Sequence, residues 1–289
     1  MASSNPILPL ISAELAQPVD PRVTAMASAL AQLYAGSARA VLFYGSCLRE
    51  TQLDGLMLDF YLIVSDYSDA YQKGWMALAN RLIPPNVFPF QHNGLIAKYA
   101  VLSEADFYRL NGPETRNVSV WARFAQPSRL VWSVDDSARA RAEGAVARAA
   151  PTLLAAAGRV DGESMIQWWS RAFALTYSVE LRAERSNRFQ SVVDADPLRY
   201  QRMGEAAAAA IPDDARSGGW TRRRLEGKIL SMARLAKASF TYAGGIEYLA
   251  WKINRHAGTQ IVLKPWQRRW PLLAAFTLVP RLLRSGAVR

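Results

Sequence analysis

Two short stretches in the first quarter of the chain carry residues that could do chemistry on a phosphate. Gly45-Ser46 follows an apolar run at 41–44, and Asp59 lies near the start of a second apolar run at 58–64. A buried carboxylate is costly unless a cation or a donor balances it. One interpretation places Asp59 at a metal ion, with Gly45-Ser46 letting backbone N–H groups approach a phosphate. The other places Asp59 at a strand edge in water, and residue types alone do not separate the two.

The two apolar runs predict neighbouring buried strands, and they are the elements that position these residues. Strands are expected over 41–44, 58–64, 95–102, 118–124 and 129–133, and helices over 22–34, 69–83, 161–184, 194–209, 225–243 and 246–256, with one more starting at 135. Prolines at 84, 85 and 89 predict an irregular connection between the second helix and the third strand. This order predicts an α+β fold, a mixed sheet with helices followed by a mainly helical C-terminal region.

Composition excludes two classes of site. With 289 residues and 51% hydrophobic content, the chain can form one large core or two domains. Cys47 is the single cysteine, so no internal disulfide forms and nothing requires an oxidising compartment. His92 and His256 are the only histidines, which is too few for a Cys/His zinc framework. Cys47 could be interpreted as a nucleophile, but it has no histidine nearby in the sequence to activate it.

The positive charge is concentrated in the last quarter of the chain. Residues 220–289 hold 14 Lys and Arg against two Glu, a net charge of +12, while the remainder holds 21 against 22, a net charge of −1. The N-terminus lacks the pattern of a secretory signal, and the apolar run at 270–280 is about half of the roughly 20 residues that span a bilayer. We therefore expect an anionic partner for the last quarter and no membrane crossing.

Aromatic residues interleave with the basic ones in this region. The basic members are Lys228, Arg234, Lys237, Lys252, Arg255, Lys264, Arg268 and Arg269, and the aromatic ones are Tyr248, Trp251, Trp266 and Trp270. With the apolar run at 272–279, they suit a helix lying in the plane of an anionic bilayer. An ordinary amphipathic helix packed on the core is the first alternative. A nucleic-acid surface has the same charge and ranks behind both.

Read together, several blocks of the sequence resemble one known family. Gly-Ser, a loop and a carboxylate early in the next strand resemble the DNA polymerase beta-like nucleotidyltransferase superfamily. The blocks YGSCLRE (44–50), LMLDFYLIVSD (56–66), AKYAVLS (97–103), VWARFAQPSRLV (120–131), TYSVELRAERSNRFQSVV (176–193) and FTYAGGIEYLAWK (240–252) are similar, in order, to those of the mitochondrial-type phosphatidate cytidylyltransferases, the translocator assembly and maintenance family. Ordered agreement over most of the chain is more specific than any one block.

The resemblance implies an Mg²⁺-dependent enzyme that transfers a cytidylyl group from CTP to phosphatidic acid, giving CDP-diacylglycerol and pyrophosphate. It implies a nucleotidyltransferase-like domain at 1–134, a helical domain at 135–219 that completes the active site, and a basic helical membrane-associating tail at 220–289. The expected location is cytoplasmic, peripheral on the inner face of a membrane. The residues implied are Asp59, Glu180 and Lys98 as catalytic, Gly45, Ser46, Arg123, Arg182 and Arg188 as nucleotide-binding, and Asp59, Glu180 and Glu184 as metal ligands.

The chain departs from the superfamily at the second carboxylate. Two carboxylates two residues apart on a strand point the same way, yet position 61 is Tyr. Asp66 is about 23 Å from Asp59 along a straight strand and of opposite parity. We therefore expect Glu180 or Glu184, one helical turn apart, to lie close to Asp59. The alternative for these two is a surface ion-pair ladder of little energetic consequence.

Further departures concern the substrate. Residues 80–92 lack the family's aromatic, histidine-bearing block, the segment between Arg182 and Glu184 is shortened, and Gln126 stands where a lysine is usual. Two other functions stay open from the sequence. One is a nucleotidyltransferase acting on an RNA end, a protein or a small molecule, and the other is a non-catalytic protein that binds RNA or a membrane.

Overall fold

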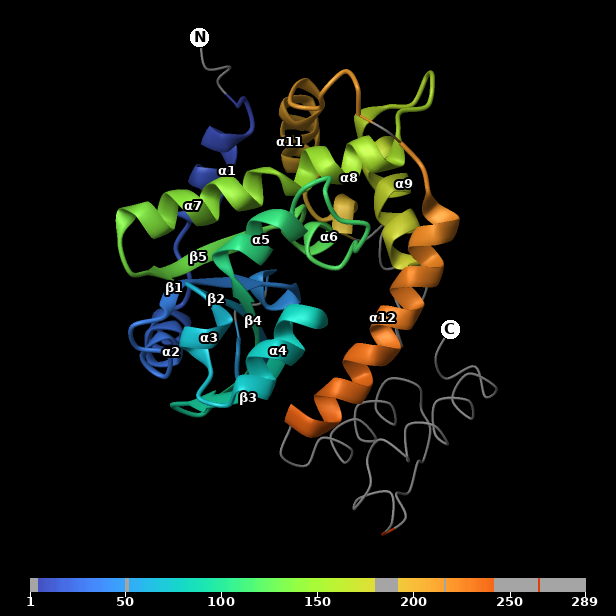
Figure 1. The fold of residues 1–289 in the computed structure, drawn as a ribbon. Helices are drawn as coiled ribbons and strands as arrows, with labels where there is room; N and C mark the ends of the chain where they lie inside the picture. Colours follow the sequence, from blue (N-terminus) through green and yellow to red (C-terminus); the bar gives the residue numbers. More distant parts are fainter. Residues whose placement is uncertain (1–4, 50–51, 180–191, 216, 242–264, 266–289) are drawn as a thin grey trace.

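The fold is taken from a computed structural model that describes residues 5–49, 52–179, 192–215, 217–241 and 265. Its centre is a five-stranded mixed sheet with strand order β3-β4-β2-β1-β5 (Figure 1). The strands are β1 (Ala38–Tyr44), β2 (Met57–Val64), β3 (Asn86–His92), β4 (Leu95–Ser103) and β5 (Ser128–Ser133). β2 and β4 are parallel, and the other neighbours are antiparallel. The expected α+β fold is confirmed.

The sheet separates two hydrophobic cores, because successive side chains of a strand point to opposite faces. Tyr61 and Leu102 point into one core, and Phe60 and Val101 point into the other. The second core is covered by α2 (Pro21–Gln32), α3 (Tyr67–Ala70) and α4 (Gly74–Leu82). The first core is covered by α1 (Leu8–Leu15), α5 (Glu104–Leu110), α6 (Trp121–Phe124), α7 (Asp136–Ala147), α8 (Ala149–Ala157), α9 (Met165–Tyr177) and α11 (Pro197–Ala209).

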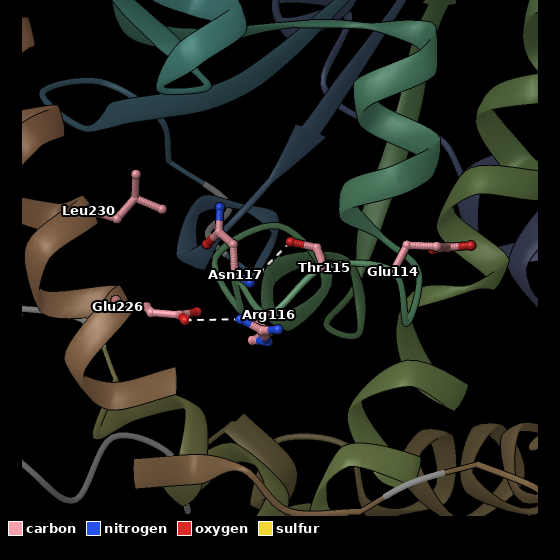
Figure 2. A pocket seen from close by; sticks show the side chains of 7 residues that line it. Glu114, Thr115, Arg116, Asn117, Glu226 and Leu230 are labelled. Carbon is pink, nitrogen blue, oxygen red and sulfur yellow. Dashed lines mark hydrogen bonds and ion pairs between the residues drawn. The ribbon is translucent and has the colours of Figure 1, made fainter. Parts of the chain in front are cut away.

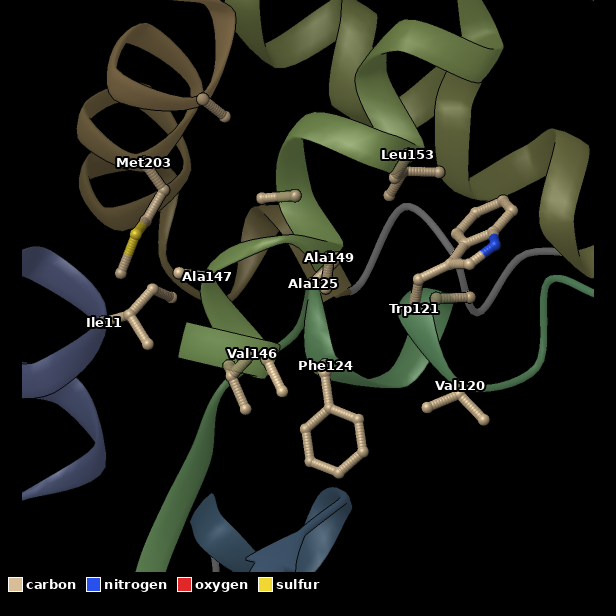
Figure 3. Packing of buried hydrophobic residues seen from close by; sticks show 14 of the residues in the cluster. Ile11, Val120, Trp121, Phe124, Ala125, Val146, Ala147, Ala149, Leu153 and Met203 are labelled. Carbon is tan, nitrogen blue, oxygen red and sulfur yellow. The ribbon is translucent and has the colours of Figure 1, made fainter. Parts of the chain in front are cut away.

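The first core joins both halves of the chain. Figure 3 shows Ile11 of α1, Phe124 of α6, Val146 of α7 and Met203 of α11 converging on one apolar interior. The helices α7, α8, α9 and α11 therefore share this core with the strand-rich half. Burial of this large apolar face, at about 25 cal/mol per Å², is the main force that fixes the helices on the sheet.

Short polar side chains begin most of these helices. Asp20, Asp135 and Asp196 accept hydrogen bonds from backbone N–H groups in the first turns of α2, α7 and α11. Ser164 and Gln167 form a complete capping box at the start of α9. Because the first N–H groups of a helix lack partners within it, these caps define where each helix starts.

A long helix, α12 (Trp220–Thr241), connects distant parts of the molecule (Figure 1). Near its start, Trp220 donates its indole N–H to the Ala156 carbonyl of α8 at 3.1 Å. Near its end, Arg234 Nε donates to the Pro84 carbonyl at 2.8 Å and Lys237 Nζ to the Pro85 carbonyl at 2.9 Å. The helix thus bridges from the helical layer to the turn that follows α4.

Several predicted elements differ from those observed. The segment expected as a strand over 118–124 contains the helix α6, and the connection expected to be irregular contains the edge strand β3. The helix expected over 69–83 is divided into α3 and α4. The helix expected over 161–184 is described as α9, and the helix expected over 246–256 lies outside the described residues.

In the part of the chain that the structure describes, every helix is too short or too polar to cross a bilayer.

Candidate functional site

The candidate site lies where β1 ends and β2 begins. Asp59 is the third residue of β2; it is in register with Tyr44 on β1 and with Lys98 on β4. Residues directly opposite on neighbouring strands point to the same face of a sheet. The Lys98 Nζ accordingly lies 2.9 Å from the Asp59 Oδ1, with 30% of the lysine side chain and 21% of the aspartate side chain exposed. Two of the predicted catalytic residues therefore form an ion pair.

Gly45 forms the wall on the other side of Asp59. Its φ angle is +97°, and a Cβ built on it would lie 3.2 Å from the Asp59 Oδ2. Only glycine adopts such a backbone without strain and also leaves this space open. Ser46 follows, exposed, at the start of a single 3-10 turn, η1 (Ser46–Arg49). The exposed turn at Gly45 thus lies next to the Asp59 Oδ2, and Lys98 pairs with the Asp59 Oδ1.

A second carboxylate at position 61 would share the face of Asp59. That position is instead occupied by Tyr61, whose side chain is part of the apolar core. Tyr61 is 2% exposed, and its ring lies 5.2 Å from that of Tyr44 and 5.1 Å from that of Phe124. Asp66 cannot replace it, because Asp66 lies beyond the opposite end of β2. There it begins α3, where the backbone N–H and hydroxyl of Ser68 keep the pKa of its carboxyl below the usual value.

Arg123 lies in the last turn of α6, and its guanidinium donates to the Ser119 carbonyl. The adjacent Phe124 packs on Tyr44, with ring centroids 6.1 Å apart, so α6 adjoins the end of β1. Gln126, at the position where the family has a lysine, donates to the Ala122 carbonyl at 2.9 Å. These contacts hold the α6 segment beside the candidate site.

Four predicted site residues lie outside the described residues: Glu180, Glu184, Arg182 and Arg188. The expected approach of Glu180 or Glu184 to Asp59 stays a prediction. Among the described residues, His, Cys, Asp and Glu side chains gather nowhere in a group of three or more that could hold a metal ion.

One feature that sequence reasoning missed is a cavity of about 410 Å³ between the loop at 114–117 and α12. Figure 2 shows Arg116 of the loop directed at Glu226 of α12, with Leu230 and Asn117 both above this pair in the view. The Arg116 Nη1 lies 3.1 Å from the Glu226 Oε1. No sequence signal marks this cavity, because it depends on contact between segments more than 100 residues apart.

Arg223, one helical turn before Gly227, ties α12 to the loop at 114–117. It donates to the Arg116 carbonyl at 3.0 Å, and burial lowers the pKa of its guanidinium. A Cβ on Gly227 would lie 2.3 Å from Val179 Cγ1, so this glycine allows close approach of α12 to Val179, the last described residue before 180–191.

A site built from one carboxylate, one ammonium and an exposed backbone turn suits a bound phosphate with a divalent cation. Mg²⁺ takes oxygen ligands and keeps several waters, so one carboxylate plus phosphate oxygens is an adequate donor set. Asp59 supplies that carboxylate, and Gly45 leaves its Oδ2 uncrowded. Asp59 thus offers an oxygen ligand of the kind that Mg²⁺ takes, and phosphate oxygens and waters would have to supply the others.

Comparison of the sequence with protein-family models and with curated protein sequences found no match.

Proposed function

We propose that the chain is a nucleotidyltransferase that transfers a cytidylyl group from CTP to phosphatidic acid and releases pyrophosphate. The observation that carries the proposal is the position of Asp59, between the Gly45 turn on one side and the Lys98 ammonium on the other. The ordered sequence blocks supply the choice of nucleotide and acceptor.

In this proposal a phosphate oxygen of phosphatidic acid attacks the α-phosphorus of CTP, and the bond from that phosphorus to the bridging oxygen breaks. Asp59 would hold Mg²⁺, which supplies neutralising charge at the phosphates. Lys98 provides a second positive charge, and the Gly45-Ser46 turn lets the backbone approach the triphosphate. The acceptor phosphate is already anionic, so no strong general base is needed.

Arg123 has a supporting role in this proposal. Its segment is held beside Tyr44 by the packing of Phe124. Glu180, Glu184, Arg182 and Arg188 are proposed to complete the site from the helical half.

The lipid acceptor implies contact with a membrane, and α12 offers a suitable surface. Leu225, Ile229 and Met232 are 64%, 54% and 39% exposed and recur at helical spacing. The exposed basic residues beside them are Arg222, Arg224 and Lys228. An exposed apolar stripe flanked by basic residues fits an anionic bilayer, on which the protein would be peripheral, at the cytoplasmic face.

The proposal is tested by incubating the full chain with CTP, Mg²⁺ and vesicles that contain phosphatidic acid. Wild-type protein should form CDP-diacylglycerol, and Asp59→Asn should lower the rate by roughly 100-fold or more, because it removes the metal carboxylate. Asp66→Asn is the matched control, since it removes an exposed carboxylate at the opposite end of β2. Equal rates for Asp59→Asn and wild-type protein contradict the assigned role.

Other acceptors in this assay, together with binding measurements, separate the alternatives. Cytidylyl transfer to an RNA end, a protein or a small molecule with none to phosphatidic acid would establish the superfamily activity with a different acceptor. Binding of vesicles or RNA without any CTP binding would establish a non-catalytic protein.

A further inference from the structure

The ion pair between Lys98 and Asp59 has a consequence for metal binding. Among the described residues, Lys98 is the cation that pairs with Asp59, at 2.9 Å from its Oδ1. The two residues are held in register on the parallel strands β2 and β4, so the pairing follows from the sheet itself. The carboxylate that would hold a divalent cation therefore already has a cation beside it.

Two cations at one carboxylate repel each other, and both side chains are partly screened from water by the sheet. A divalent metal must therefore either bind beside the ammonium or displace it. Both routes weaken binding of the metal to the free protein.

A bound triphosphate changes this balance. Lysine has a flexible four-carbon stem and a compact ammonium that can turn from one anion to another. The Gly45 turn is located at the second oxygen of Asp59, so a phosphate at this turn would lie near the carboxylate whose first oxygen pairs with the ammonium. The triphosphate can then take over the ammonium and leave Asp59 to the metal.

We propose that Lys98 is a positioning residue that makes metal binding at Asp59 depend on the nucleotide. In the free protein its ammonium occupies Asp59, and in the nucleotide complex it pairs with the triphosphate. The inference rests on the proposed function for the identity of the nucleotide, but it does not depend on the acceptor. Coupling of this kind is reciprocal, so metal also raises nucleotide affinity through Lys98.

The first test measures Mn²⁺ binding to the full-length, nucleotide-free chain by electron paramagnetic resonance. Lys98→Gln removes the competing charge, and its Kd for Mn²⁺ should fall by about tenfold relative to wild type, within the usual range of coupling between sites. Lys98→Arg keeps the charge and should bind Mn²⁺ about as weakly as wild type. The double variant Lys98→Gln/Asp59→Asn should lose the increase in Mn²⁺ affinity, which would show that the increase arises at Asp59.

The second test measures CTP binding by calorimetry, with EDTA and with saturating Mn²⁺. The metal should raise CTP affinity by a larger factor in wild type than in Lys98→Gln, because only wild type has an ammonium to release. Thermal unfolding identifies any variant that fails to fold, and Lys98→Met then replaces Lys98→Gln as the neutral variant.

Equal Mn²⁺ affinities for wild type and the neutral Lys98 variants overturn the inference. Equal metal-induced gains in CTP affinity also overturn it. A protein that shows both Lys98 effects yet forms no CDP-diacylglycerol keeps the inference and refutes the proposed acceptor. A protein that forms CDP-diacylglycerol but shows neither Lys98 effect supports the proposed function and refutes the inference about Lys98.

Discussion

At the scale of residues, the candidate site depends on Gly45 as much as on the charged pair. The residue has a φ of +97°, and any side chain on it would approach the Asp59 Oδ2. Gly36 has a similar φ of +88°, but a Cβ there would meet nothing within 4 Å. The two glycines thus share a backbone requirement and differ in whether they contact the carboxylate.

We predict that Gly45→Ala impairs the site beyond its effect on the backbone. Both Gly45→Ala and Gly36→Ala should lower the free energy of unfolding by about 1–2 kcal/mol, the usual cost of a positive φ for alanine. Only Gly45→Ala should also weaken CTP binding, because its methyl group crowds Asp59. Denaturant unfolding and calorimetry check the two parts. Equal CTP affinities for the two variants would show that the Gly45 contact has no role.

Part of this site could be predicted from residue types and part could not. The apolar runs around Gly45 and Asp59 predicted the two strands correctly, because their pattern is local. The pairing of Asp59 with Lys98 requires the parallel register of β2 with β4, which no local pattern encodes. The tyrosine at position 61 showed from the sequence alone that the second carboxylate is missing. The structure adds that Tyr61 is buried, which explains an aromatic residue there.

At the scale of elements, segments rich in proline or in mixed apolar residues were the hardest to predict. β3 contains Pro89 and still pairs with β4, because it is an edge strand and proline is tolerated there. α6 is a single short helical turn, and its apolar run fits a strand equally well until tertiary packing places Trp121 and Phe124 in the core. By contrast, α2 and α7 begin at clear N-terminal caps, and helices were expected at both places.

The helix α12 allows a direct test of membrane contact. We predict that Leu225→Ser/Ile229→Ser lowers partition onto vesicles containing phosphatidic acid by about tenfold, as the loss of roughly 1.4 kcal/mol of apolar transfer predicts. Leu33→Ser/Leu198→Ser is the matched control, because both leucines are exposed on other helices or their ends, at 61% and 76%. Vesicle sedimentation gives the partition coefficient. Similar losses in the two double variants would argue against α12 as the membrane surface.

At the scale of the whole molecule, α12 joins the helical layer to the turn at 83–85, and Lys237 is central to that contact. Its ammonium donates to the Pro85 carbonyl, and burial, followed by repulsion from Arg234, lowers the pKa of Lys237 from 10.5 to about 7. We therefore expect the stability of the folded chain to depend on pH through this lysine.

The sign of this dependence follows from proton linkage. Between pH 7 and pH 10.5 the unfolded chain holds a proton on Lys237 that the folded chain has lost, so this residue makes stability rise with pH across that window. Below pH 7 both states are protonated, and the contribution of the residue is constant. We predict that the free energy of unfolding of wild type rises more steeply over this window than that of Lys237→Met. Denaturant unfolding at several pH values measures both slopes, and parallel slopes contradict the prediction.

The central claim is that the chain transfers a cytidylyl group from CTP to phosphatidic acid. The most direct measurement incubates wild-type protein with phosphatidic acid vesicles, Mg²⁺ and CTP labelled either at the α- or at the γ-phosphate. We predict that the α label enters the chloroform-soluble lipid as CDP-diacylglycerol and that the γ label is released as pyrophosphate. Absence of the α label from the lipid, with the protein folded and CTP bound, would contradict the account.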